Sequence, residues 1–166
     1  MATITLKGAE FHTNGELPTV GSQAPDFILT TQSLADVSLS DYAGKKKLIS
    51  IVPSLDTPVC QLSSKKFNEH AAKFPDAVIL IVAADLPFAM GRFCKAEGLD
   101  NIITLSMMRG REFAEDYGVL IEDGPFKGIT SRALLVLDED NVVISAELVR
   151  EVADEPDYDA ALAKLN

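Results

Sequence analysis

The sequence is poor in the residues that build disulfide frameworks and metal sites, with two cysteines and two histidines among 166 residues. Two cysteines in a chain of this size, without a secretion signal, suggest a reducing compartment and a transient rather than a structural bond between them. His12 and His70 lie too far apart in the sequence to suggest a metal site. The cysteine count therefore favours redox chemistry over structural cross-linking.

Positive charge and long apolar runs are also scarce. The chain has 15 lysines and arginines against 25 aspartates and glutamates, a net charge of −10. This balance argues against a nucleic-acid or anionic-membrane surface. No apolar run approaches the roughly 18 residues of a membrane span, and residues 1–16 lack the apolar segment of a signal peptide. We expect a cytoplasmic rather than a periplasmic protein, with neither nucleic acid nor membrane as a partner.

The length and the apolar pattern predict one α/β domain over residues 1–166. The continuous apolar run at 77–83 is typical of a central parallel strand, and strands alternate with helices around it. We expect a mixed central sheet flanked by helices, with an N-terminal β-hairpin that turns at Asn14-Gly15. The other expected strands are 3–6, 27–30, 37–39, 48–52, 101–105, 132–137 and 142–146, and the expected helices are 58–74, 85–98 (capped by Asp85, stopped by Gly98), 112–117 and 156–165.

The most informative segment is PSLDTPVC at 53–60, between a predicted strand and a predicted helix. Thr57 suits the N-cap and Pro58 the first helical position, so Cys60 falls third in the helix. There a thiolate would lie within reach of the Thr57 hydroxyl and the free amides, at the positive end of the helix dipole. Cysteines at helix starts can have a pKa of roughly 3.5–7.5 instead of about 8.5. The alternative is a small buried cysteine that packs as a hydrophobe.

Cys94 lies on a different predicted helix, so the two cysteines form neither a CxxC redox motif nor a zinc site. A disulfide between them needs the two α-carbons within about 7 Å, so at least one helix end must fray to make it. The alternative is a core cysteine beside Phe93. No cysteine follows Cys94, which excludes a resolving thiol in the C-terminal tail.

The chain resembles a known family at this point. The pattern Pro53-x-x-x-Thr57-x-x-Cys60 is similar to the active-site signature of the peroxiredoxins. Longer segments resemble the bacterial thiol peroxidase subfamily: ADLPFA at 84–89, RFC at 92–94, AEGL at 96–99 and DGP at 123–125. The resemblance covers the whole chain. It implies a thioredoxin-like fold with an extra N-terminal hairpin, a homodimer, and no metal or organic cofactor.

The resemblance also implies roles for individual residues. Cys60 becomes the peroxidatic thiol and Cys94 the resolving thiol, while Thr57 and Pro53 belong to the active-site pocket. The family's active-site arginine falls on Arg132. The implied reaction reduces hydrogen peroxide and alkyl or lipid hydroperoxides through a Cys60 sulfenic acid and a Cys60–Cys94 disulfide. Thioredoxin would recycle the enzyme, and antioxidant defence would be its purpose.

The residues alone do not single out Arg132, which without the resemblance is an ordinary surface arginine. Its position before an apolar strand is compatible with a guanidinium that points into a site at the edge of the sheet. Ser131 stands where the family leads us to expect alanine. Leu55, Phe88 and Phe93 are candidates for an apolar substrate pocket.

Two other functions use the same thiol pair. The protein could be a redox sensor or regulator in which the cysteines toggle a binding surface. It could also be a thiol–disulfide oxidoreductase that never meets peroxide. Thioredoxin-dependent consumption of peroxide distinguishes both from the peroxidase.

Overall fold

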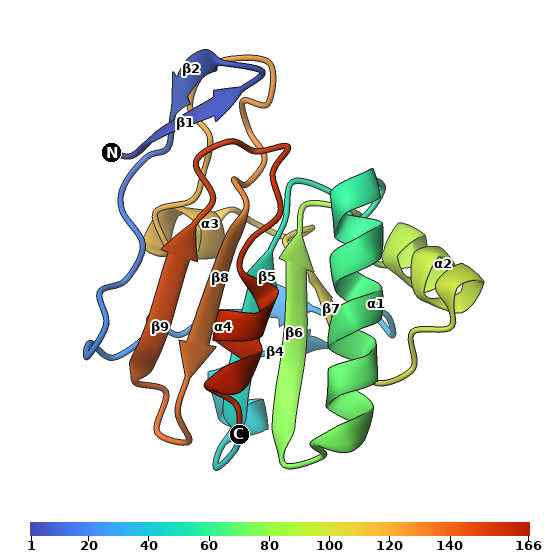
Figure 1. Ribbon diagram of the computed structural model, residues 1–166. Coiled ribbons are helices and arrows are strands. Elements are labelled where there is room, and N and C mark those ends of the chain that lie inside the picture. Colours follow the sequence, from blue (N-terminus) through green and yellow to red (C-terminus); the bar gives the residue numbers. More distant parts are fainter.

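A seven-stranded mixed sheet forms the centre of the computed structural model, which describes the backbone of all 166 residues and every side chain except that of Cys60 (Figure 1). The three middle strands β7, β6 and β5 run parallel, and the flanking pairs are antiparallel. In spatial order the strands are β4 (Asp36–Val37), β3 (Leu29–Thr30), β7 (Ile103–Ser106), β6 (Ala77–Ala83), β5 (Lys46–Ile51), β8 (Ala133–Leu137) and β9 (Val143–Leu148). The mixed α/β architecture predicted from the sequence is confirmed.

The apolar strand β6 lies in the middle of the sheet, with its predicted bounds and with parallel neighbours on both sides. Its residues alternate between two hydrophobic cores: Ile79 and Ile81 belong to one, and Leu80 and Val82 to the other. A strand that is covered on both faces needs apolar side chains at every position. This requirement explains why its sequence is continuously apolar.

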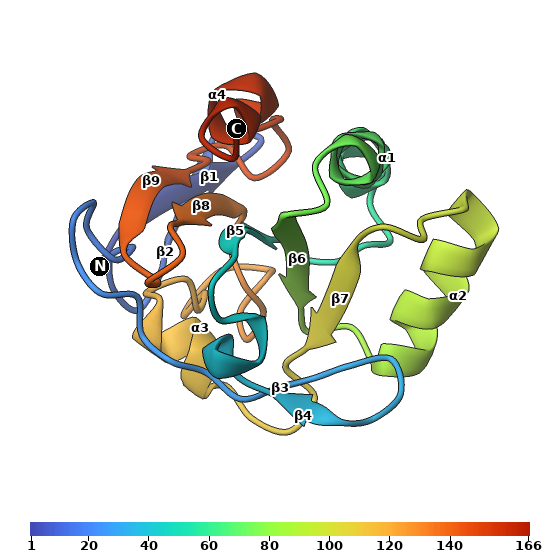
Figure 2. The ribbon, with the colours of Figure 1, turned by 90° about the horizontal axis from the view of Figure 1, so that it is seen from below.

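Helices cover the two faces unequally (Figure 2). The core that contains Ile79 and Ile81 packs against three helices, α1, α2 and α4. The opposite core packs against α3 and a short 3₁₀ helix, η1. The helices are η1 (Leu39–Tyr42), α1 (Pro58–Lys73), α2 (Pro87–Glu97), α3 (Glu112–Asp116) and α4 (Tyr158–Ala163). Cys60 in α1 and Cys94 in α2 therefore lie on helices that cover the same face of the sheet.

The N-terminal β-hairpin is present, but its turn is not where the sequence pattern placed it. Strands β1 (Thr3–Leu6) and β2 (Ala9–His12) pair antiparallel across Lys7-Gly8, whose φ angles are 51° and 83°. Two positive φ angles at the centre of a two-residue turn match the twist of the strands. The Asn14 side chain instead donates to the Glu115 carbonyl (3.0 Å) and accepts from the Leu120 amide (3.1 Å). The prediction that the hairpin turns at Asn14-Gly15 was therefore wrong, although the chain does bend at these two residues after β2.

The strands expected at 27–30 and 37–39 are shorter in the structure, because one carboxylate takes amides from both segments. Asp26 Oδ1 accepts from the amides of Phe27 (2.8 Å) and Leu39 (3.1 Å). Those amides are then unavailable to a sheet ladder, and η1 starts at Leu39.

Within the described part of the chain, no helix is long and apolar enough to cross a membrane.

Candidate active site

The segment that carries Cys60 begins where β5 ends at Ile51 and closes at the start of α1. Thr57 is the N-cap with extended backbone angles (φ −127°, ψ 150°), and Pro58 is the first helical residue. Cys60 is thus third in the helix, as the sequence predicts; its side chain lies outside the described part, so its backbone alone defines the position. The first turn offers free amides and the positive end of the helix dipole to any anion there.

Thr57 caps the helix through its backbone rather than through its side chain. Its hydroxyl donates to the carbonyl of Ser54 (3.2 Å) and makes no capping bond to an amide among the described residues. Pro53 is buried at the start of the segment. Both residues therefore shape the loop that leads to Cys60.

Asp85 fastens this loop and does not cap α2 as the sequence suggested. Its carboxylate accepts from the Ser54 hydroxyl (2.8 Å) and from the Leu55 amide (2.7 Å). The N-cap of α2 is Leu86, because Pro87 takes the first helical position. The preference of proline for the first helical position was a signal in the sequence for this arrangement. It would have moved the predicted N-cap from Asp85 to Leu86.

Arg132 lies near the start of the same loop and is only 4% exposed. It is therefore not an ordinary surface arginine. Ala133 pairs with Ile51 across β8 and β5, which sets Arg132 beside the residue that follows β5. The Thr130 hydroxyl donates to the carbonyl of Val52 (2.8 Å), and Arg132 Nε donates to the carbonyl of Val152 (2.9 Å). The buried Arg132 side chain thus donates to a backbone carbonyl, and its residue lies next to the start of the Cys60 loop.

Ser131 is fully buried next to Arg132. Its hydroxyl has no hydrogen-bond partner among the described residues. Nothing in the structure explains why serine stands here in place of the expected alanine.

Cys94 is a free thiol near the C-terminal end of α2 and is 6% exposed. It packs in the same hydrophobic core as Leu55, Met90 and Leu99. Burial raises the pKa of the Cys94 thiol, and hydrogen bonds from Gln32 and Thr104 oppose that shift. The residue therefore has the packing of a core cysteine together with polar partners that a purely apolar role does not need.

The three candidate pocket residues do come together. Leu55, Phe88 and Phe93 line one groove of about 610 Å³ between the loop before α1 and the outer face of α2. Phe88 is 67% exposed, whereas Leu55 is buried. The charged residues of the groove are Asp56, Asp85, Arg92 and Glu97. The groove is thus lined by both apolar and charged side chains.

The two faces of α2 differ sharply. Its groove-lining residues are Phe88, Ala89, Arg92, Phe93, Ala96 and Glu97, a stripe at helical spacing. Met90 and Cys94 are one turn apart on the opposite face and enter the core. Cys94 is therefore turned away from the groove.

Among the described residues, no group of three histidine, cysteine, aspartate or glutamate side chains could hold a metal ion.

A cysteine in the first turn of the helix after β5, on a mixed sheet with an added N-terminal hairpin, defines a thioredoxin-like protein of the peroxiredoxin class. The Redoxin family model matches residues 19–162. A thiol peroxidase of Leptospira interrogans is 47% identical over 168 residues, which cover 100% of this chain and 98% of that protein. The chain belongs to the Redoxin family and, within it, to the thiol peroxidases among the peroxiredoxins.

Solved structures agree with this assignment. A peroxiredoxin-like protein from Aquifex aeolicus superposes with a TM-score of 0.92 at 37% identity, covering 99% of this chain and 96% of that one. A thiol peroxidase from Chromobacterium violaceum gives a TM-score of 0.89 at 30% identity, covering 98% and 94%. The thioredoxin-like fold and the peroxidase class of oxidoreductase predicted from the sequence are confirmed.

Proposed function

We propose that this chain reduces hydrogen peroxide and alkyl hydroperoxides with Cys60 as the attacking thiolate. The observation that carries the proposal is the buried Arg132 beside the end of β5, from which the loop runs to Cys60 in the first turn of α1. A fixed cation and a helix start provide positive charge for a thiolate and for the oxygens of a peroxide.

In the first step the Cys60 thiolate attacks one peroxide oxygen. The S–O bond forms as the O–O bond breaks, and the departing oxygen takes up a proton to leave as alcohol or water. Cys60 is thereby oxidised to a sulfenic acid. Arg132 stabilises the negative charge that develops on the departing oxygen, and Thr57 and Pro53 form the walls that hold the peroxide in line.

In the second step Cys94 resolves the sulfenic acid. The Cys94 sulfur attacks the Cys60 sulfur, the S–O bond breaks, and the hydroxyl leaves as water with the thiol proton. A dithiol of the thioredoxin type then reduces the disulfide through a mixed disulfide. Membership of the peroxidase family supports a hydroperoxide substrate and a thioredoxin-type reductant in general. Lipid hydroperoxides are included in the proposal because Leu55, Phe88 and Phe93 give the groove apolar surface.

Steady-state peroxide consumption with thioredoxin, thioredoxin reductase and NADPH tests the proposal. Cys60→Ser should abolish turnover, whereas Cys94→Ser should still consume one equivalent of peroxide per chain. After one equivalent of peroxide, mass spectrometry of the wild type should show a loss of two hydrogens and a linked Cys60–Cys94 peptide. Full turnover by Cys60→Ser would refute the peroxidase assignment. A disulfide that forms without catalytic turnover would instead favour the redox sensor.

The role of Arg132 has its own matched control. Loss of one donor to a developing oxyanion costs about 10²–10³ in rate in other enzymes. Arg132→Lys should therefore slow Cys60 oxidation by roughly that factor, while the same change at Arg150, whose side chain is 72% exposed, should have no effect. Equal rates for the two variants would exclude Arg132 from the first step.

We further propose that the chain, as a single domain over 1–166, forms a homodimer. Ile28 is 76% exposed beside a groove that also involves Phe27 and Phe113, an arrangement that suits burial against a second copy. Sedimentation velocity should give a dimer for the wild type and a smaller species for Ile28→Asp. A monomeric wild type would refute this part alone.

A further inference from the structure

We propose that Gln32 and Thr104 form a seat for the reduced Cys94 thiol, the Cys94 seat, which controls how readily Cys94 leaves the core to reach Cys60. This inference rests on the proposed function, because it concerns the resolving step. Gln32 Nε2 donates to Thr104 Oγ1 (2.8 Å), and both side chains lie close enough to the Cys94 thiol to oppose the effect of burial on its pKa. Gln32 and Thr104 are therefore positioning residues for the second thiol.

The Cys94 seat is built from two separate parts of the chain. Thr104 is 1% exposed in the middle of β7, where it pairs with Ile81 of β6. Gln32 comes from the turn between β3 and β4 and lies against α2, since a Cβ added at Gly91 would stand 3.4 Å from Gln32 Oε1. Gly91 is one helical turn before Cys94. The thiol is thus bounded by the sheet on one side and by this turn on the other.

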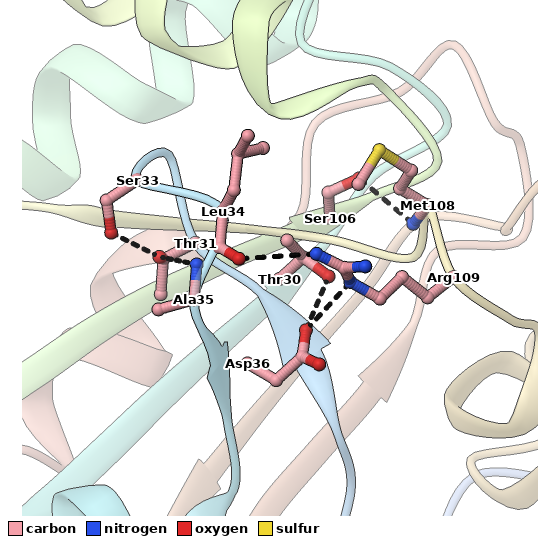
Figure 3. A network of polar contacts seen from close by, with 9 residues as sticks. All are labelled: Thr30, Thr31, Ser33, Leu34, Ala35, Asp36, Ser106, Met108 and Arg109. Atoms are coloured by element: carbon pink, nitrogen blue, oxygen red, sulfur yellow. Dashed lines mark hydrogen bonds and ion pairs between the residues drawn. The ribbon is translucent and has the colours of Figure 1, made fainter.

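The turn that carries Gln32 is itself held by the polar network in Figure 3. Arg109 Nε donates to Asp36 Oδ1 (3.0 Å), and Arg109 Nη2 donates to the carbonyl of Leu34 (3.2 Å). The hydroxyl of Thr30 donates to the same Asp36 oxygen (3.0 Å). These contacts order the backbone of the turn independently of Cys94. Placing the Gln32 carboxamide beside the thiol therefore costs little additional conformational entropy.

The seat opposes the resolving step for a geometric reason. Cys94 is on the core face of α2, and the opposite face lines the groove next to the Cys60 loop. A disulfide brings the two α-carbons within about 7 Å, so the end of α2 must open and the thiol must leave Gln32 and Thr104. Polar contacts that the thiol has only in the reduced form stabilise that form relative to the disulfide. They also slow the departure of Cys94.

Thr104→Val tests the seat with little change of shape, and Thr104→Ser is the matched control because it keeps the hydroxyl. Gln32→Met removes the carboxamide at similar length. The reduced proteins receive a pulse of hydrogen peroxide and are quenched, alkylated and analysed by mass spectrometry over time. Thr104→Val and Gln32→Met should form the disulfide about two- to tenfold faster, the effect of one lost hydrogen bond. They should also accumulate less sulfinic acid in excess peroxide, and Thr104→Ser should follow the wild type.

An equilibrium measurement separates the seat from general packing. In glutathione redox buffers the disulfide of both variants should be favoured by the same two- to tenfold, and each tenfold corresponds to a reduction potential about 30 mV more negative. Arg109→Gln should reproduce part of the Gln32→Met effect and add nothing to it, because Arg109 acts through the turn.

The glutathione equilibrium needs no peroxide, so it distinguishes the two ideas. Failure to react with peroxide together with the expected shifts in glutathione would refute the proposed function and support the seat. Variants whose resolution rate and disulfide equilibrium match the wild type would overturn the seat even in an active peroxidase. A chain that forms no Cys60–Cys94 disulfide in either assay would overturn both.

Discussion

Asp85→Ala removes the carboxylate that fastens the Cys60 loop to the segment between β6 and α2. Two donors lose their acceptor, the hydroxyl of Ser54 at 2.8 Å and the amide of Leu55 at 2.7 Å. Leu55 is buried, so its amide cannot simply turn to solvent. The substitution should therefore both destabilise the fold and loosen the geometry at the start of α1.

The magnitude follows from the two contacts. A hydrogen bond to a charged group contributes about 1.5–3 kcal/mol. Because Asp85 is only half-buried, we take the lower end for each bond, which gives about 3 kcal/mol for the pair. In a domain of this size each kcal/mol lowers Tm by about 2–4 °C, so Tm should fall by about 6–12 °C. Ser54→Ala removes one of the two bonds and also the acceptor of the Asp56 amide (3.1 Å), so it should cost at least half as much.

Thermal and urea unfolding of the reduced protein measure these differences. The control is Asp56→Ala, since Asp56 is exposed and lies in the same loop and groove. The rate of Cys60 oxidation by hydrogen peroxide provides the functional readout, and it should fall for Asp85→Ala more than for Asp56→Ala. If the two variants unfold within about 0.5 kcal/mol of each other, the ordinary range for a surface substitution, the carboxylate does not fasten the loop.

Three further predictions concern a thiol, a groove and a phenol. Burial raises the pKa of the Cys94 thiol, so iodoacetamide should label native Cys94 more slowly than in urea at pH 8, and equal rates would contradict its burial. Phe88→Ala should raise KM for cumene hydroperoxide about fivefold and leave KM for hydrogen peroxide unchanged, as expected for about 1 kcal/mol of apolar contact; exposed Leu86→Ala is the control. Burial also raises the pKa of the Tyr117 phenol, so its stabilisation is complete below about pH 10 and is lost as the pH rises further. Tyr117→Phe should cost about 1 kcal/mol at pH 7, from the bond to the Pro25 carbonyl, and should flatten the alkaline decline in urea unfolding.

Features encoded by neighbouring residues were predictable from the sequence. The bounds of β6 follow from a continuous apolar run, and the start of α1 follows from Thr57-Pro58. Gly98, with φ 67° and ψ 38°, ends α2 in the left-handed conformation that glycine tolerates best. In each case the cause and the structural effect lie within a few residues of each other.

Features that depend on distant partners were not predictable in the same way. The burial of Arg132 depends on the pairing of Ala133 with Ile51 and on the carbonyl of Val152. Gln32 and Thr104 are hydrogen-bonded although they are far apart in the sequence, and no local pattern announces their contact. The fold determines which of many polar side chains meet, so a spacing argument alone could select the two cysteines as candidates but not the groups around them.

In the proposed resolving step, α2 stays attached at its N-terminal end and opens at its C-terminal end. At its N-terminal end Asp85 joins the loop of Cys60 through two charge-assisted hydrogen bonds. At its C-terminal end Glu97 pairs with Lys65 of α1 (3.0 Å) through partly exposed side chains, a type of pair that contributes only about 0–1 kcal/mol. Opening α2 from Gly98 back to Cys94 takes Cys94 and Leu99 out of the hydrophobic core but leaves the Asp85 attachment intact. In this proposal the Cys94 seat is one polar barrier to release of the thiol.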